Sequence, residues 1–81
     1  MIKVLFFAQT RELVGVDSVE VEAVFPTAEA LRQHLVSQGG KWELALESGK
    51  LLTAINQTIS PLESEISDGD EVAFFPPVTG G

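Results

Sequence analysis

The sequence predicts an α+β fold: a small mixed sheet whose first and last strands are central, with one main helix packed across one face. The most apolar segments, 2–7 and 71–75, lie near the two ends of the chain, and such segments are typical of central strands. Between them lie an alternating strand, 18–24, and a helix, 28–38, that carries one apolar stripe. Because such a stripe needs a sheet to cover, the helix and the sheet should form two layers.

In the first half of the chain, each element has a local signal. After the first strand, 8–14 has the composition of one or two helical turns that close at Gly15. In 18–24, valine and alanine alternate with glutamate, so this strand should be half-buried. Thr27 is a good N-cap for the helix at 28–38, whose apolar stripe should face the sheet. The stripe consists of Ala28, Leu31 and Leu35.

The second half of the chain has shorter elements. Residues 42–46 should form a second short helical segment before Ser48-Gly49, with Trp42 as a lid on the core. A third strand is expected at 51–56, and a short edge strand at 58–60. The final strand follows a turn rich in aspartate and glycine.

Composition narrows the class of protein. With 81 residues, the chain should form one domain, 1–75, followed by an extended tail, 76–81. Twelve acidic residues against five basic ones give a net charge of −7, which argues against nucleic acid as a ligand. The acidity indicates either solubility or steering towards basic partner surfaces. The absence of cysteine excludes disulfides, cysteine-ligated metals and a cysteine nucleophile.

The sequence also gives expectations about location and metal binding. The apolar start of the chain reaches polar residues at 9–12 without a small-residue cleavage site, so it is typical of a strand and not of a signal peptide. No run approaches the ~20 apolar residues of a membrane span, and we expect a cytoplasmic protein. The single histidine, His34, lies away from the helical stripe and lacks partners for a catalytic or metal-binding role, so we expect it on the surface.

The C-terminal tail is the predicted functional part of the chain. Its two prolines cannot donate ladder hydrogen bonds and keep the backbone stiffly extended. The four residues from Val78 onward can reach at most roughly 13–14 Å at about 3.3–3.6 Å each, which suits insertion into a partner's pocket. The terminal glycines fit a narrow channel and leave the carboxylate unhindered, so a nucleophile could attack it once it is activated. The tail comprises Pro76, Pro77, Val78, Thr79, Gly80 and Gly81.

A second functional clue comes from the two-residue period of strands. If Phe6 and Phe74 face the helix, then Phe7 and Phe75 point to the uncovered face of the sheet. Ile59 is a possible third member of this group. Aromatic side chains exposed near the root of a tail are typical of a partner-docking surface. The alternative is that the short helical segments cover them.

The residues also carry a resemblance to a known family. The motifs that carry it are KVLFFA at 3–8, REL at 11–13, NQ at 56–57 and DGDEVAFFPPVTGG at 68–81. On these motifs the chain resembles, from end to end, the small, sulfur-carrying subunit of molybdopterin synthase (the MoaD family). The FFPP lead-in distinguishes this family from the thiamin-pathway sulfur carrier, which shares the fold and the Gly-Gly end.

The resemblance implies a ubiquitin-like β-grasp fold and a role as a sulfur carrier. In that family an E1-like activating enzyme, related to ubiquitin-activating enzymes, uses ATP to adenylate the terminal carboxylate, here Gly81. The carboxylate then becomes a thiocarboxylate with sulfur from a sulfur donor protein. The carrier inserts its tail into the large synthase subunit, where the sulfur enters cyclic pyranopterin monophosphate (precursor Z) and forms the dithiolene of molybdopterin. The usual assembly has two small and two large subunits, and the resemblance implies no cofactor, metal or complete active site on this chain.

The residues alone leave other functions open. The chain could be a protein modifier joined through Gly81 to a target lysine, or a sulfur carrier of the thiamin type. Because activation begins with the same adenylation, only the product separates a modifier from a sulfur carrier. A third possibility is a non-covalent module whose C-terminus is bound as a peptide, for which ATP is irrelevant. A free-standing enzyme is the weakest option, since no nucleophile, base and orienting group form a recognisable set.

Overall fold

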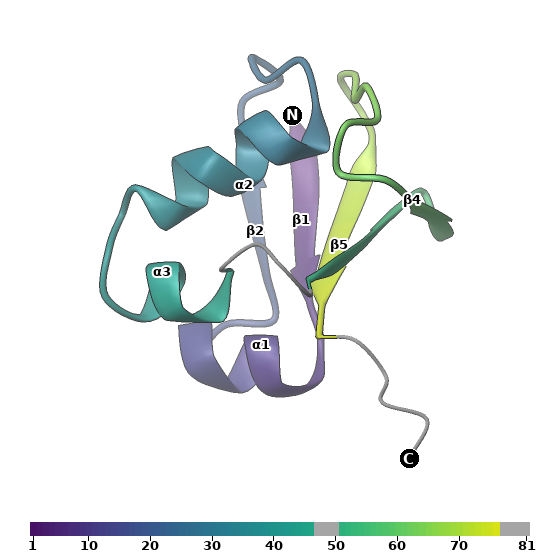
Figure 1. The fold of residues 1–81 in the computed structure, drawn as a ribbon. Coiled ribbons are helices and arrows are strands. Elements are labelled where there is room, and N and C mark those ends of the chain that lie inside the picture. The colour runs from purple at the N-terminus through teal and green to yellow at the C-terminus, as the bar shows by residue number, and fades with distance from the viewer. Residues whose placement is uncertain (47–50, 77–81) are drawn as a thin grey trace.

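Strand β5 (Glu71–Phe75) lies at the centre of the sheet and pairs in parallel with β1 (Ile2–Phe6) (Figure 1). The structure is a computed structural model that describes residues 1–46 and 51–76. Strands β2 (Ser18–Val21), β3 (Leu52–Ile55) and β4 (Thr58–Ser60) complete a five-stranded sheet in the order β2-β1-β5-β3-β4. Their pairings are antiparallel. The first and last strands are therefore central, as the sequence predicted.

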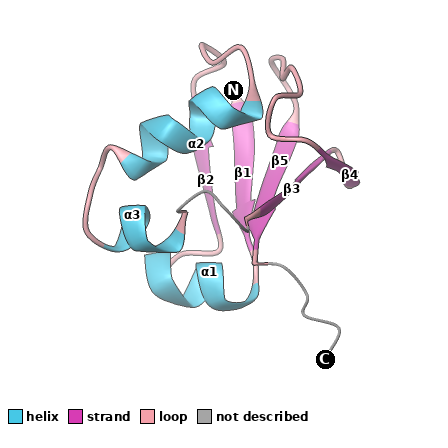
Figure 2. Ribbon diagram, viewed as in Figure 1, coloured by secondary structure: helices cyan, strands magenta, loops and turns pink. Residues whose placement is uncertain are grey.

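The helices in the described part of the chain pack on one face of the sheet (Figure 2). They are α1 (Ala8–Val14), α2 (Ala28–Val36) and α3 (Lys41–Ala45). The main helix, α2, begins at the predicted N-cap: the Thr27 side-chain oxygen accepts a hydrogen bond from the Ala30 N–H at 3.1 Å. Helix α1 ends at Gly15, whose φ of 83° is a left-handed conformation that glycine adopts without strain.

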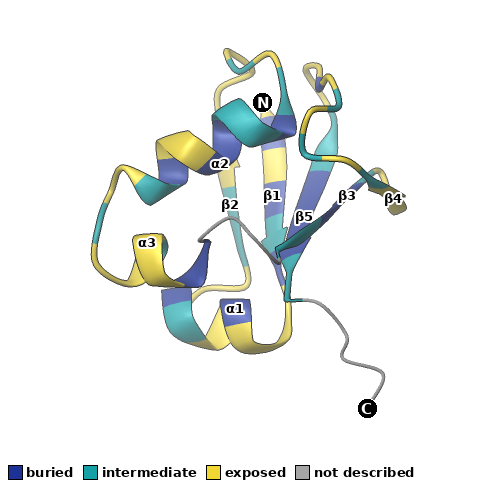
Figure 3. Cartoon of the chain, viewed as in Figure 1, coloured by how far each residue is buried: buried dark blue, intermediate teal, exposed yellow. Residues whose placement is uncertain are grey.

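The hydrophobic core fills the space between these helices and one face of the sheet (Figure 3). The central strands contribute core residues at every second position, namely Ile2, Val4, Phe6, Val72 and Phe74. The predicted stripe of α2 is buried against them. Trp42 lies over Phe6 in an edge-on arrangement, with ring centroids 5.6 Å apart, which confirms its predicted place as a lid. Because each large apolar side chain contributes about 1.5–3 kcal/mol when buried, this face stabilises the fold.

Strand β2 is shorter than predicted. It ends at Val21, and Val24 is 68% exposed, whereas the alternating pattern extended the strand to residue 24. The cause lies in its partner: Val21 pairs with Ile2, the first residue of β1. Met1 is held by a different segment, because its carbonyl oxygen accepts a hydrogen bond from the Gly69 N–H at 2.9 Å. The alternation continues in the sequence, but the strand has no further partner there.

Two other elements end slightly earlier than predicted. Helix α2 stops at Val36, where the Gly39 N–H donates to the Val36 carbonyl oxygen at 2.9 Å, and Gly39 has a φ of 74°. The predicted helix extended to residue 38, so its last two residues are not helical. Strand β3 spans 52–55 within the predicted 51–56.

Some predicted features lie outside the described residues. They are the Ser48-Gly49 pair expected after the second short helix and the tail residues Pro77, Val78, Thr79, Gly80 and Gly81. Pro76 is described and is half-buried immediately after β5. Of the helices within 1–46 and 51–76, none is long and apolar enough to span a membrane.

Candidate functional site

The face of the sheet opposite the helices carries a continuous row of small and apolar side chains. Leu5 of β1 pairs with Ala73 of β5, Ala73 pairs with Ala54 of β3, and Ala54 pairs with Ile59 of β4. Residues paired in this way point to the same face. Since Phe6 and Phe74, their chain neighbours, point into the core, this row lies on the open face.

A second row lies next to the first, towards the end of β5. Phe75 pairs with Leu52 of β3, again on the open face. Phe7 follows Phe6, the last paired residue of β1, and Phe6 pairs with Phe74, so Phe7 falls one position further along beside Phe75. Phe7 is 47% exposed and Ile59 is 66% exposed, while Phe75 is half-buried. The open-face patch, as we call both rows together, consists of Leu5, Phe7, Leu52, Ala54, Ile59, Ala73 and Phe75.

The structure therefore brings the three predicted docking residues onto one face. The alternative, in which short helices cover them, is wrong for Phe7 and Ile59, because α1 and α3 bury their apolar residues in the core on the other face. Their role in docking stays a prediction. Sequence reasoning missed the other members of the patch, Leu5, Leu52, Ala54 and Ala73. The two-residue period could have placed them on this face, but their proximity depends on the register between strands.

The other half of the open face is charged. Lys3 of β1 pairs with Glu20 of β2 on one side and with Glu71 of β5 on the other. Asn56 secures the same end of the sheet, because its side-chain oxygen accepts from the Glu71 N–H at 3.0 Å and its amide donates to Asp70 at 3.1 Å. The open face thus has an apolar half and a charged half.

The N-terminus and the root of the tail lie at opposite ends of this sheet. The N-terminal ammonium group contacts the Asp68 carboxylate, and this hydrogen bond holds the pKa of Asp68 below its usual value. Because β1 and β5 are parallel, β5 ends at Phe75 beside Phe7 and not beside Met1 (Figure 1). Pro76 follows directly. The root of the tail, Pro76, therefore lies next to the apolar half of the open face.

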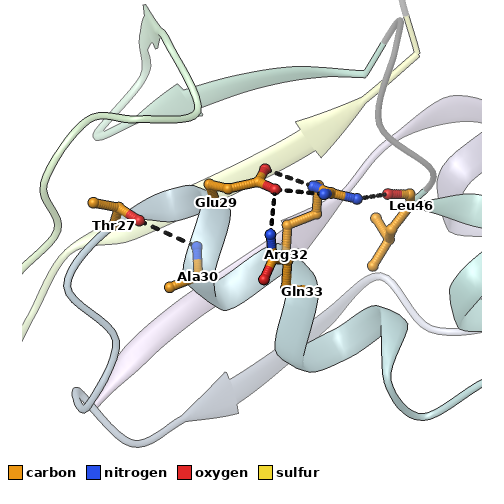
Figure 4. A network of polar contacts seen from close by, with 6 residues as sticks. All are labelled: Thr27, Glu29, Ala30, Arg32, Gln33 and Leu46. Atoms are coloured by element: carbon orange, nitrogen blue, oxygen red, sulfur yellow. Dashed lines mark hydrogen bonds and ion pairs between the residues drawn. The ribbon is translucent and has the colours of Figure 1, made fainter.

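Polar groups on the helix side have a structural role. The guanidinium group of Arg32 donates to the two carboxylate oxygens of Glu29 at 2.8 and 2.6 Å, and to the Leu46 carbonyl oxygen at 2.7 Å (Figure 4). The hydrogen bond from Arg32 is the main cause that lowers the pKa of Glu29, and the same bond raises the pKa of Arg32. This network ties α2 to the residue that follows α3.

The described residues offer no evident catalytic cluster. His34 is exposed, as predicted, and its ring lies 4.8 Å from that of Phe25, centroid to centroid. Within 1–46 and 51–76, no group of three or more histidine, cysteine or acidic residues is arranged to hold a metal ion. The features that remain for function are the open-face patch and the tail that begins beside it.

Comparison with known proteins identifies the family. The model of the ThiS family matches residues 4–81. The chain is 68% identical to the molybdopterin synthase sulfur carrier subunits of Escherichia coli and of Haemophilus influenzae, over the full length of both chains. The chain belongs to the molybdopterin synthase sulfur carrier family. The predicted resemblance is confirmed.

Solved structures agree with the fold of this sulfur carrier family. A putative molybdopterin converting factor subunit 1 from Pyrococcus furiosus matches with a TM-score of 0.76 and 29% identity, covering 95% of this chain and 97% of that one. SAMP1 from Haloferax volcanii gives 0.75 and 27%, covering 99% and 98%. The complex of subunits 1 and 2 of the molybdopterin-converting factor from Helicobacter pylori contains a chain that gives 0.68 and 25%, covering 99% and 97%. The fold is the predicted ubiquitin-like β-grasp.

Proposed function

We propose that this chain carries sulfur on the carboxylate of Gly81 and delivers it to the large subunit of molybdopterin synthase. The observation that carries the proposal is the full-length 68% identity to sulfur carrier subunits of that enzyme. The geometry supports it, because the parallel pairing of β1 with β5 puts the root of the tail beside the open-face patch. A partner that binds the patch can therefore receive the tail.

The proposed chemistry has three steps, all at the end of the tail. An oxygen of the Gly81 carboxylate attacks the α-phosphorus of ATP on an E1-like activating enzyme and displaces pyrophosphate. The persulfide sulfur of a donor protein then attacks the acyl carbon and displaces AMP. A second thiol attacks the donor sulfur of the resulting acyl disulfide, forms a disulfide with the donor, and leaves the thiocarboxylate on Gly81. Because a dithiolene contains two sulfur atoms, two charged carriers each transfer one sulfur to cyclic pyranopterin monophosphate. Each sulfur displaces an oxygen substituent of the precursor, and water then cleaves the thioester to Gly81 and restores the carboxylate.

In this scheme, the chain supplies the carrier and its partners supply the catalytic groups. The thiocarboxylate is a sulfur nucleophile that needs no cysteine, and the chain has none. We propose that no cofactor binds to this chain and that ATP is used on the activating enzyme. We also propose that the active site for sulfur transfer lies on the large subunit, in an assembly of two small and two large subunits. The Helicobacter pylori complex of subunits 1 and 2 supports such a partner.

A second candidate function is protein modification. The similarity to SAMP1, called a small archaeal modifier protein in one of the matched structures, favours this alternative. A modifier would use the same adenylated Gly81 but would end in an isopeptide bond with a lysine. The family membership favours sulfur transfer, and the product of the activated tail distinguishes the two.

The proposal is tested by intact-mass measurement. The chain is incubated with its activating enzyme, ATP and a sulfur source, and a chain that lacks Gly80 and Gly81 serves as the control. We expect a mass gain that corresponds to the replacement of one oxygen by one sulfur, located in the C-terminal peptide and absent from the control. Conjugates to other proteins without any thiocarboxylate would favour the modifier. An unchanged mass would overturn both candidates.

A further inference from the structure

Positive backbone φ angles occur next to the open-face patch. Among residues 1–46 and 51–76, the non-glycine residues with positive φ are Ala8 at 53°, Asn56 at 51° and Gln57 at 71°. Ala8 follows Phe7, and the pair of Asn56 and Gln57 forms the turn that leads into the strand of Ile59. For residues with a Cβ atom this conformation is unfavourable, and it clusters at functional sites.

The two turns differ in whether strand pairing holds the neighbouring residue of the patch in place. Asn56 and Gln57 connect β3 with β4 in a two-residue turn, where positive φ at both positions is the favoured geometry. The pairing of Ala54 with Ile59 holds the side chain of Ile59 on the open face. Asparagine tolerates the conformation, and only Gln57 is a less favourable choice.

Phe7 has no such support from a neighbouring strand in the observed register, because the pairing of β1 with β5 ends at Phe6 and Phe74. Its backbone, with φ −127° and ψ 155°, is still extended, which keeps its side chain on the open face. The next residue, Ala8, turns the chain into α1, where Thr10 and Val14 are buried. Because the chain must join these two fixed elements, the restricted φ of Ala8 also limits the backbone angles that are open to Phe7.

The methyl group of Ala8 restricts the backbone and does not fill the core. Ala8 is exposed, so its side chain contributes little packing. Glycine would adopt the same φ without strain, but it would also open conformations that are closed to alanine. We propose that Ala8 is a positioning residue, whose restricted backbone holds Phe7 in the orientation that the large subunit binds. This inference rests on the proposed function.

Three variants test the proposal. Ala8→Gly removes the restriction, while Ala8→D-Ala, made by chemical synthesis, keeps a rigid backbone for which positive φ is unstrained. Gln57→Gly is the matched control, because it makes the same kind of change at a position where strand pairing holds Ile59. For each variant, the Kd for the cognate large subunit is measured by calorimetry, and the Tm is measured without the partner.

We expect Ala8→Gly to keep a Tm close to that of the wild type and to raise the Kd about 3- to 10-fold, since the side chain of Phe7 must then be ordered on binding. Ala8→D-Ala should raise the Tm and keep the wild-type Kd. Gln57→Gly should likewise keep a Tm close to that of the wild type, and it should keep the wild-type Kd. Coupling constants for the Phe7 side chain should show averaging in the Ala8→Gly protein alone.

An unchanged Kd for Ala8→Gly would overturn the positioning role, and so would an equal loss of affinity in Ala8→D-Ala. Unfolding of Ala8→Gly would show that the residue is needed for the fold itself, and it would also overturn the positioning role. These results differ from a failure of the proposed function, in which the wild-type chain itself does not bind the large subunit. That outcome would remove both proposals.

Discussion

Phe6 and Phe7 are neighbours in the chain, yet they lie on opposite faces of the sheet. Phe6 is 1% exposed and packs under Trp42, whereas Phe7 is 47% exposed on the open face. Successive side chains of a strand point to opposite faces, so Phe6 stabilises the core while Phe7 remains available for binding.

Alanine variants of this pair should therefore have opposite effects. Phe6→Ala should lower the free energy of unfolding by about 3–5 kcal/mol, because it leaves a cavity in the core. Phe7→Ala should leave stability nearly unchanged and weaken binding of the large subunit by about 1–2 kcal/mol. Urea unfolding and calorimetric titration measure the two effects. A Phe7→Ala protein that binds as tightly as the wild type would exclude Phe7 from the docking surface.

Ile59 can be tested against a residue of similar exposure elsewhere. Ile59 is 66% exposed on β4, and Leu44 is 61% exposed on α3, away from the patch. Ile59→Asp should weaken large-subunit binding on the order of tenfold or more, since a charge would be buried against an apolar partner surface. Leu44→Asp should leave the Kd unchanged. Equal losses in both variants would indicate a general effect of added charge and not a docking site.

The last residue of the tail should matter for chemistry and not for folding. Gly81→Ala places a methyl group beside the carboxylate that must be activated, so the rate of sulfur transfer should fall severely while the Tm stays that of the wild type. Molybdopterin formation in a reconstituted synthase measures the transfer, and thermal unfolding measures the fold. Full activity of Gly81→Ala would contradict the need for an unhindered glycine.

Glu29 should make stability depend on pH in the acid range. Its hydrogen bonds from Arg32 lower its pKa in the folded state, so the charged form stabilises the fold. This contribution is complete above the ordinary pKa of glutamate and is lost as the pH falls through the lowered folded value. Glu29→Gln should therefore flatten the acid side of a plot of urea midpoint against pH. Glu63→Gln, at an exposed position, is the control, and identical curves for both variants would contradict the role of Glu29.

Local patterns were sufficient to predict most elements of the fold. The Thr27 cap, the stripe of α2 and the stop at Gly15 depend on residues a few positions apart, and all were confirmed. The central position of β1 and β5 followed from their apolar composition. The end of β2 could not be predicted, because it depends on where β1 begins.

The candidate site was only partly predictable for the same physical reason. Phe7, Ile59 and Phe75 could be assigned to the open face from alternation, but Leu52 and Ala54 join them through pairing with distant strands. The left-handed backbone of Ala8 has no sequence signal, since alanine rarely adopts it. The burial of Arg32 depends on the carbonyl oxygen of Leu46, 14 residues further along the chain.

The edge-on contact between Trp42 and Phe6 has a practical consequence. Trp42 is the single tryptophan of the chain, and it reports on the helix-covered face. Its fluorescence should follow the loss of the core during denaturation and stay constant when a partner occupies the opposite face. The molecule thus carries an intrinsic optical probe that distinguishes unfolding from docking without an added label.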